Sequence, residues 1–235
     1  MDGKGEIDVA VRYDDYSDFG TNTSYTVKGL FEVMEGLTIR ASVGTGFRAP
    51  GLGDLVANTS FSADYHNDYV KCNALGIARA DCPEEQVNTY ISANPNLGPE
   101  ESEATNFGVI YERGMHSVAV DFFNTEIEGI ITSVSVQDII DASILGPTYL
   151  AQLTGQGAYC TRSDSTSSAP LAECFRGPIN GNNSTVAGTD VKYSGLFTSK
   201  VGDFDVNFSL VLMDESESEA FFNGCLLYTS DAADE

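Results

Sequence analysis

The sequence has 235 residues, of which 42% are hydrophobic and 20% are charged. Acidic residues outnumber basic ones by 35 to 12, giving a formal net charge of -23. The hydrophobic fraction excludes a disordered polymer. The charge excludes nucleic acid as a partner, because binding to phosphates needs Lys and Arg. No apolar run reaches the roughly 18 residues of a transmembrane helix, a test that leaves a transmembrane β-barrel open.

Seven segments alternate between apolar and polar residues. In the first, Ile7, Val9 and Val11 share one face, and the polar residues between them share the other. Successive side chains of a strand point to opposite faces, so each such segment predicts a β-strand. In chain order the segments are 6–16, 25–33, 37–45, 107–111, 118–122 (with an extension to 131 left open), 191–197 and 204–212. No comparable segment has a helical period, so the predicted class is all-β.

The connections alternate between short and long. Short turns are expected at 34–36, 113–115 and 200–203, and long loops at 48–99 and 133–186. The acidic run 214–219 is expected to open one more loop. Hairpins with short periplasmic turns and long extracellular loops are typical of outer-membrane barrels. Alternation alone also fits a secreted β-sandwich adhesin or binding module, or a passive porin, and these alternatives stay open.

Four tyrosines lie toward the ends of predicted strands: Tyr13, Tyr25, Tyr111 and Tyr193. They fit the aromatic girdle of a membrane barrel. They fit the ordinary preference of tyrosine for strands equally well.

Each long loop contains two cysteines, Cys72 and Cys82 in the first and Cys160 and Cys174 in the second. Four cysteines allow three pairings. The pairing within each loop, Cys72–Cys82 and Cys160–Cys174, is favoured. Disulfides indicate an oxidising compartment such as the periplasm or the cell surface.

The last residues, 225–235, read like a translated sequencing adapter and are set apart from the fold. The expected organisation is a single β-barrel portion over 1–224, followed by a non-native tail over 225–235. The chain is then expected to be a fragment of a longer protein.

Two motifs flank the first long loop. Strand 37–45 runs into Gly46, Phe47, Arg48, Ala49 and Pro50. The next strand is preceded by Asn94, Pro95, Asn96, Leu97, Gly98, Pro99 and Glu100. Together with the stretches 8–20 and 120–131, in this order, they make the chain resemble the TonB-dependent outer-membrane receptors.

The resemblance implies a transporter in the bacterial outer membrane. Family members are barrels of about 22 antiparallel strands around an N-terminal plug. They bind a scarce solute (a siderophore, haem, cobalamin or an oligosaccharide) and import it with energy from the TonB complex. This chain would supply about seven strands in contact with membrane lipid, and the plug that meets TonB would be missing.

The motif residues are expected to be structural. Gly46 and Pro50 bracket the point where a strand stops, because Pro removes a ladder donor. Arg48 is expected to pair with a carboxylate, with Glu100 and Glu101 as candidates. The Asn-Pro-Asn and Gly-Pro stretches are turn chemistry. Ligand-binding residues stay unknown at this stage.

Other chemistry is set aside. His66 lies among Asp64, Asn67 and Asp68, a group that could hold Ca²⁺ but lacks the spacing of a calcium loop, so a solvated polar loop is favoured. Residues 180–183 read as a loop. No catalytic set or phosphate loop occurs, so no enzyme activity, cofactor or metal is expected. An acidic outer surface repels anions, so the charge slightly favours neutral solutes such as sugars or peptides over an anionic ferric chelate.

Overall fold

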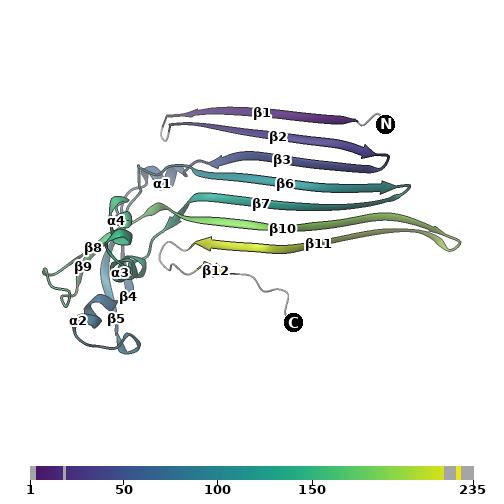
Figure 1. The fold of residues 1–235 in the computed structure, drawn as a ribbon. Coiled ribbons are helices and arrows are strands. Elements are labelled where there is room, and N and C mark those ends of the chain that lie inside the picture. Colours follow the sequence, from purple (N-terminus) through teal and green to yellow (C-terminus); the bar gives the residue numbers. More distant parts are fainter. Residues whose placement is uncertain (1–3, 18–19, 220–225, 229–235) are drawn as a thin grey trace.

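The computed structural model describes residues 4–17, 20–219 and 226–228 (Figure 1). All seven predicted strands are present and form one antiparallel sheet, which a short eighth strand extends in the order β1-β2-β3-β6-β7-β10-β11-β12. The strands are β1 Gly5–Tyr16, β2 Gly20–Met34, β3 Leu37–Arg48, β6 Glu100–Arg113, β7 His116–Ser133, β10 Pro178–Ser199, β11 Gly202–Glu219 and β12 Leu226–Tyr228. The fold is therefore an open portion of an antiparallel barrel, as predicted.

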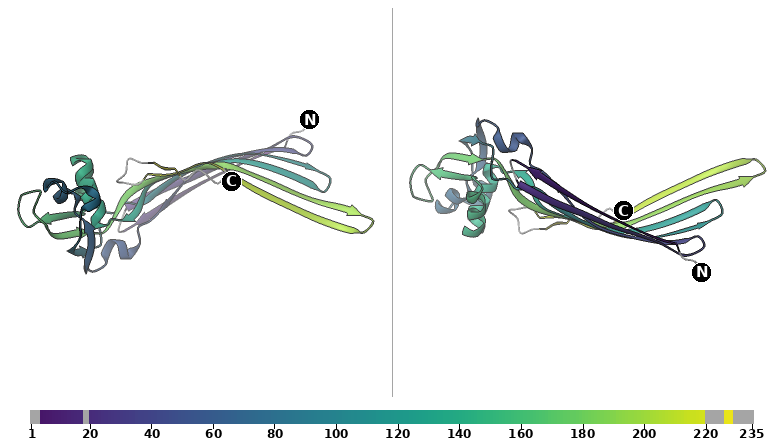
Figure 2. Two further views of the ribbon diagram at one scale, coloured as in Figure 1. Left: turned by 90° about the horizontal axis from the view of Figure 1, so that it is seen from below. Right: turned by 90° about the horizontal axis from the view of Figure 1, so that it is seen from above.

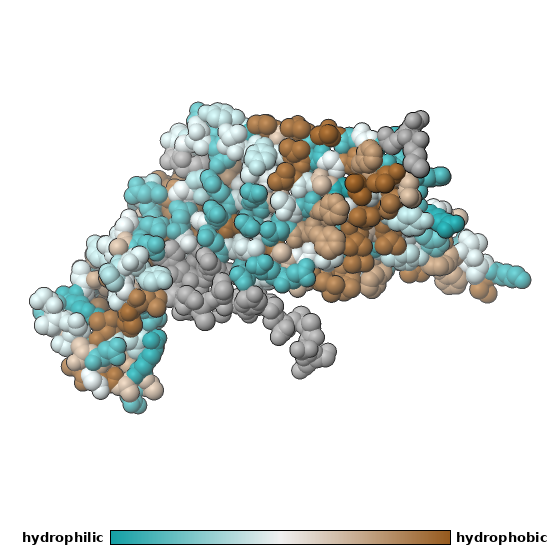
Figure 3. All heavy atoms as spheres, in the orientation of Figure 1, coloured by the Kyte–Doolittle hydropathy of each residue, from teal (hydrophilic) through white to brown (hydrophobic). Residues whose placement is uncertain are grey.

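The apolar residues of neighbouring strands lie in register on one face of this sheet. Val27 of β2 is opposite Val9 of β1 and Val43 of β3, and Val120 of β7 is opposite Val191 of β10. Many apolar side chains of this face are exposed (79% for Ile7 and 63% for Val9), Val43, Val120 and Val191 are half-buried, and no second layer of described residues covers the face. In Figure 3 the brown side chains gather over the half of the sheet nearer the short turns.

The four tyrosines of the expected girdle share this apolar face. Tyr13 and Tyr25 lie toward the end of the sheet that carries the long loops, whereas Tyr111 and Tyr193 lie toward the short turns. Their placement at two levels fits a girdle. Whether they mark a membrane interface stays a prediction.

The strands continue past the apolar band, which the sequence did not predict. Glu101 and Glu103 of β6 lie opposite Glu128 and Glu126 of β7, so the outer part of this face is acidic. The acidic run 214–219 belongs to β11 and is not a loop. Residues 180–183 likewise belong to β10, where register shifts mark an irregularity. Alternation of apolar and polar residues is lost there because both faces of these outer segments meet water.

The short turns depend on glycine. Gly36 joins β2 to β3 with a φ of 77° and Gly114 joins β6 to β7 with a φ of 62°. A Cβ atom on Gly36 would also lie 2.2 Å from the carbonyl oxygen of Glu112. The turns therefore keep the strand ends of β2, β3 and β6 close together.

The expected tail 225–235 is described only over Leu226–Tyr228, as β12, which pairs with Glu217, Ser218 and Glu219 of β11. Residues 225 and 229–235 lie outside the described residues. The adapter interpretation therefore stays a prediction.

The two long loops fold together into one outer domain, at the end of the sheet opposite the short turns (Figure 2). A four-stranded sheet combines strands of both loops in the order β4-β5-β9-β8, and β5 pairs with β9 in parallel. Its strands are β4 Ser60–Asn67, β5 Glu84–Ile91, β8 Tyr159–Arg162 and β9 Leu171–Arg176. The helices are α1 Leu52–Val56, α2 Tyr69–Ala74, the 3₁₀ helix η1 Arg79–Asp81, α3 Val136–Leu145 and α4 Pro147–Gly155.

Helix α3 packs between two clusters of buried apolar residues. Ile139 and Ala142 join a cluster with Leu153 of α4, and Val136 and Ile140 join one with Val87 of β5. Ser135 caps α3: its hydroxyl oxygen accepts a hydrogen bond from the Asp138 amide, and the Asp138 carboxylate accepts one from the Ser135 amide, a reciprocal arrangement that fixes the helix start. Among the described residues, no helix has the length and apolar character needed to cross a membrane.

Candidate functional site

The rim of the sheet is fixed by an ion pair between the two motifs. Arg48 ends β3 directly opposite Glu100, the first residue of β6. Arg48 Nε donates to Glu100 Oε2 at 2.6 Å and Nη2 donates to Oε1. The Ile131 amide of β7 donates to the same Oε1 at 2.8 Å. Glu100, rather than Glu101, is thus the partner of Arg48, and it joins three strands where the first long loop leaves the sheet.

The rest of the first motif lets the chain leave the sheet. Gly46 lies opposite Ser102, whose hydroxyl would be 3.0 Å from a Cβ atom at Gly46. The Phe47 ring meets that of Tyr16 edge to face, with centroids 6.0 Å apart. Ala49 is half-buried and Pro50 is buried. Their contacts fit the expected structural role, which stays a prediction, and Gly46 also lines a cavity of about 270 Å³ on the sheet.

The second motif is a turn anchored by Asn94. Its Oδ1 accepts a hydrogen bond from the Asn96 amide at 3.0 Å, and its Nδ2 donates to the Pro178 carbonyl at 3.1 Å. Leu97 is buried below this turn, whereas Pro95 and Asn96 are exposed. Pro99 is half-buried and leads into Glu100. The motif therefore connects the end of the first loop to the start of β10.

Asn180, which the sequence placed in a loop, is the main fastening of the two loops to the sheet. Its Nδ2 donates to the carbonyls of Gly98 at 3.0 Å and Gly129 at 2.9 Å, and its Oδ1 accepts from the Gly98 amide at 2.8 Å. Its main chain exchanges two hydrogen bonds with the side chain of Gln156. All of these partners are distant in sequence, so no local pattern could have identified them.

Both disulfides have the predicted pairing. Cys72 of α2 is bonded to Cys82 after η1, and Cys160 of β8 is bonded to Cys174 of β9. Each bond closes a segment within one long loop. Neither bond joins one loop to the other.

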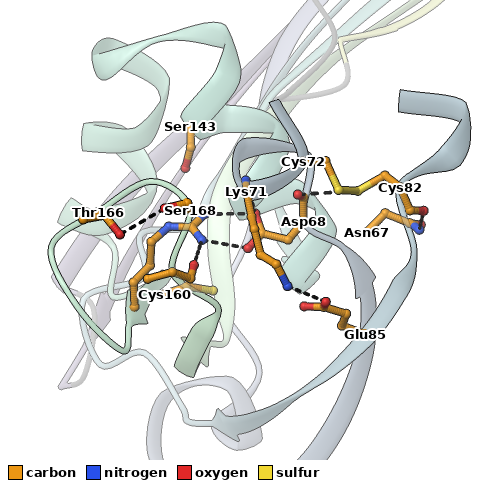
Figure 4. A network of polar contacts seen from close by, with 12 residues as sticks. Asn67, Asp68, Lys71, Cys72, Cys82, Glu85, Ser143, Cys160, Thr166 and Ser168 are labelled. Atoms are coloured by element: carbon orange, nitrogen blue, oxygen red, sulfur yellow. Dashed lines mark hydrogen bonds and ion pairs between the residues drawn. A yellow bond between two sulfur atoms is a disulfide. The ribbon is translucent and has the colours of Figure 1, made fainter. Parts of the chain in front are cut away.

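Ion pairs join the two loops instead, and Figure 4 shows Asp68, the buried carboxylate of one of them. Arg162 of the second loop donates to Asp68 of the first through Nη1 at 2.7 Å and Nη2 at 2.9 Å. Arg176 donates to Asp64 at 2.8 Å. Asp68 is 1% exposed, and the Asp64 side chain is 18% exposed. The prediction of a solvated polar loop around His66 is therefore wrong: His66 itself is buried, and the carboxylates that could hold Ca²⁺ are engaged by arginine.

The protein environment favours the charged form of Asp68. Burial raises the pKa of its carboxyl, but hydrogen bonds from Arg162 and from the Lys71 amide, together with the positive charge of Arg162, outweigh that effect. The pKa of Asp68 therefore lies below its ordinary value. Burial likewise opposes ionisation of Asp64, and hydrogen bonds from Ser62 and Arg176 lower its pKa overall.

Every basic residue of the outer domain is engaged by a carboxylate. Besides the two arginines above, Lys71 pairs with Glu85 and Arg79 pairs with Asp141. Carboxylates outnumber these cations within 49–99 and 134–177. In the described part of the outer domain an anionic ligand therefore finds no unpaired positive charge, whereas a neutral or cationic one meets no repulsion.

The polar face of the large sheet is hollowed and charged. A cavity of about 590 Å³ is lined by residues that include Lys28, Arg40, Asp121 and Lys192. Arg40 of β3 reaches across β6 to Asp121 of β7, with Nε 2.7 Å from Oδ1. The residue between them is Gly108, where a Cβ atom would lie 1.9 Å from the Asp121 carboxylate. This face is suited to water and polar partners rather than to lipid.

No group of three or more metal-binding side chains occurs among the described residues. The surfaces that could bind a ligand are the polar face of the large sheet and the outer domain.

Comparison with known proteins identifies the family. Residues 3–212 match the model of the TonB dependent receptor-like β-barrel. No curated protein matches the chain. Among solved structures, the siderophore receptor PirA from Acinetobacter baumannii is similar, with a TM-score of 0.57 and 13% identity over 90% of this chain and 26% of that one.

Two further structures show the same fold. A mutant of the ferric enterobactin receptor PfeA from Pseudomonas aeruginosa, in complex with enterobactin, has a TM-score of 0.58 and 14% identity over 90% of this chain and 25% of that one. The RagAB peptide importer has a TM-score of 0.51 and 17% identity over 94% of this chain and 21% of that one. The chain thus spans about a quarter of the length of these proteins. With a barrel model matched over most of its length, this chain belongs to the TonB-dependent receptor family.

Proposed function

We propose that the chain forms part of the wall and outer face of a bacterial outer-membrane receptor that imports a scarce solute with energy from the TonB complex. The observation that carries the proposal is the single-layer sheet with an exposed apolar face and a charged, hollowed opposite face. Lipid covers the first face of such a sheet and water the second. The folded outer domain then lies where a solute first arrives.

The two alternatives fit less well. A β-sandwich adhesin would bury the apolar face against a second sheet, whereas Ile7 and Val9 remain exposed here. A passive porin shares the sheet geometry, but membership of the TonB-dependent family favours energised uptake.

The charges of the outer domain favour a neutral or cationic solute. Each of its basic residues is held by a carboxylate, and the pairs Arg162–Asp68 and Arg176–Asp64 are largely buried. Freeing one of these arginines for an anionic ligand would leave a buried carboxylate without its partner, which is costly. Of the solutes that the family resemblance implies, an oligosaccharide therefore fits this surface better than an anionic ferric siderophore. A peptide fits as well.

The test uses the full-length receptor encoded by the reading frame that contains this chain. It is expressed in a Gram-negative host with and without TonB, and uptake of three probes is measured: a fluorescent neutral oligosaccharide, a fluorescent lysine-containing peptide and radio-iron enterobactin. We expect the receptor in the outer-membrane fraction and TonB-dependent uptake of an uncharged or cationic probe. Uptake that is unchanged without TonB would refute energised transport, and uptake of ferric enterobactin alone would refute the charge argument.

A further inference from the structure

We propose that the free edge of β4 in the outer domain binds an extended peptide by adding it as a strand. β4 (Ser60–Asn67) is an outer strand of the four-stranded sheet, paired on one side with β5. Exposed edges are normally protected by Lys or Pro, by inward-pointing charges, by a short length or by a covering helix or loop. β4 has eight residues without Lys or Pro; its Asp64 is paired with Arg176, and Gln137 of α3 occupies its last residue, Asn67. This proposal names a ligand class for the outer domain and so rests on the proposed receptor role.

At Asn67, a side-chain amide already makes the pair of main-chain hydrogen bonds that an added peptide strand would make. The side-chain amide of Gln137 accepts a hydrogen bond from the Asn67 amide at 2.9 Å and donates one to the Asn67 carbonyl at 3.4 Å. The main-chain groups of Asn67 therefore point away from β5. In an antiparallel pair this direction alternates along the strand, so the amides and carbonyls of Phe61, Ala63 and Tyr65 also point outward.

The side chains beside this edge form an apolar platform. Phe61 begins a row of aromatic rings that crosses the whole sheet through Tyr90, Phe175 and Tyr159, with centroids 5.8, 5.2 and 4.9 Å apart. This face is opposite the one packed on α3, because Val87 and Cys174, the buried residues, alternate with the aromatic ones. A strand added at β4 would lie about 4.8 Å away and extend the row by one side chain.

The spacing along β4 provides a recess for a ligand side chain. Phe61 and Tyr65 are 62% and 65% exposed, and the small Ala63 lies between them on the same face. A peptide side chain opposite Ala63 fits between the two rings. Because the outer domain has no unpaired cation among its described residues, the fitting peptide is neutral or basic, with apolar or aromatic side chains at alternate positions.

The test measures binding of a fluorescent peptide to the refolded 235-residue chain in detergent micelles. The probe is a capped peptide in which Phe and Thr alternate and a Lys ends the sequence. Its control carries N-methyl groups on every second amide, which removes the donors of one edge. We expect saturable binding of the probe and at least about tenfold weaker binding of the methylated form. Equal affinity for the two peptides, or no binding of either, would overturn the proposal.

Variants of the chain locate the site. Ala63→Pro removes an outward amide and leaves the pairing of β4 with β5 intact, and it should weaken binding about tenfold. Phe61→Ser should weaken binding through loss of the platform, whereas Leu52→Ser, an equally exposed apolar residue of α1, should not. Resistance of the disulfide-bonded domain to protease verifies that each variant is folded. Unchanged binding by Ala63→Pro, or dimerisation of the chain through this edge, would overturn the proposal.

This assay needs neither TonB nor a membrane. A receptor that imports solute but binds no peptide at β4 would refute only the edge proposal. A chain that binds the peptide while the full receptor shows no TonB-dependent uptake would refute only the transport proposal.

Discussion

Replacement of Asp68 by alanine should separate the two loops of the outer domain. The carboxylate is 1% exposed and holds the Arg162 side chain, which is 18% exposed, through two hydrogen bonds. It also caps α2 by accepting a hydrogen bond from the Lys71 amide at 3.1 Å. Breaking a buried ion pair costs about 3–5 kcal/mol, and the lower end applies because Arg162 keeps its bond to the Ala169 carbonyl and some contact with water. The lost helix cap adds about 1 kcal/mol.

We therefore expect Asp68→Ala to lower the free energy of unfolding of the outer domain by about 4 kcal/mol. Asp68→Asn should cost about 1 kcal/mol less, because asparagine caps a helix as well as aspartate does. Pulse proteolysis of the full chain in increasing urea measures both changes, and Asp81→Asn, at an exposed aspartate of the same loop, is the control. A loss below about 1 kcal/mol for Asp68→Ala would show that this ion pair does not hold the loops together.

Three further predictions follow from the same region. Asn180→Ala should lower the free energy of unfolding by about 2–3 kcal/mol through loss of three hydrogen bonds, measured by urea denaturation, while Asn96→Ala at an exposed position should have no effect. Loss of either disulfide, by Cys72→Ser with Cys82→Ser or by Cys160→Ser with Cys174→Ser, should cost about 3 kcal/mol and speed proteolysis of the outer domain but not of the large sheet. Folding lowers the pKa of Asp68. Its contribution to stability is therefore present above the unfolded pKa of about 3.9 and is lost as the pH falls through the lower folded pKa. Urea denaturation at decreasing pH should show this loss in the parent chain and not in Asp68→Asn.

The sequence predicted the strands that cross the apolar band because polarity there alternates residue by residue. Ile7, Val9 and Val11 need no distant partner to reveal their strand. The outer strand segments were missed because Glu101, Glu126 and their neighbours are polar on both faces. Arg48 was correctly expected to meet a carboxylate, but only the register of β3 with β6 selects Glu100 over Glu101.

The outer domain was missed for a different reason. Its central contact is the parallel pairing of Asn88–Ile91 in β5 with Glu173–Arg176 in β9, two segments from different loops. Strand β8 has four residues, too few to show a period. The ionic partners Asp68 and Arg162 are 94 residues apart. Pairings between such distant segments cannot be predicted from local sequence patterns. The two disulfides could be predicted because each one joins cysteines within a single loop.

The disulfides and the non-covalent contacts connect different parts of the outer domain, and this difference determines how the domain unfolds. The disulfides act within each loop, and the contacts between the loops are non-covalent. They include the β5–β9 pairing, the arginine–aspartate pairs, the Asn67–Gln137 hydrogen bonds and the aromatic row from Tyr90 to Phe175. Asn180 in turn fastens both loops to the rim, through Gly98 and Gln156, and Glu100 fixes the point where the first loop meets the sheet. Separation of the loops therefore breaks no covalent bond and leaves each disulfide in place. No disulfide crosses the boundary between β5 and β9, and the arginine–aspartate pairs are among the contacts that hold it closed.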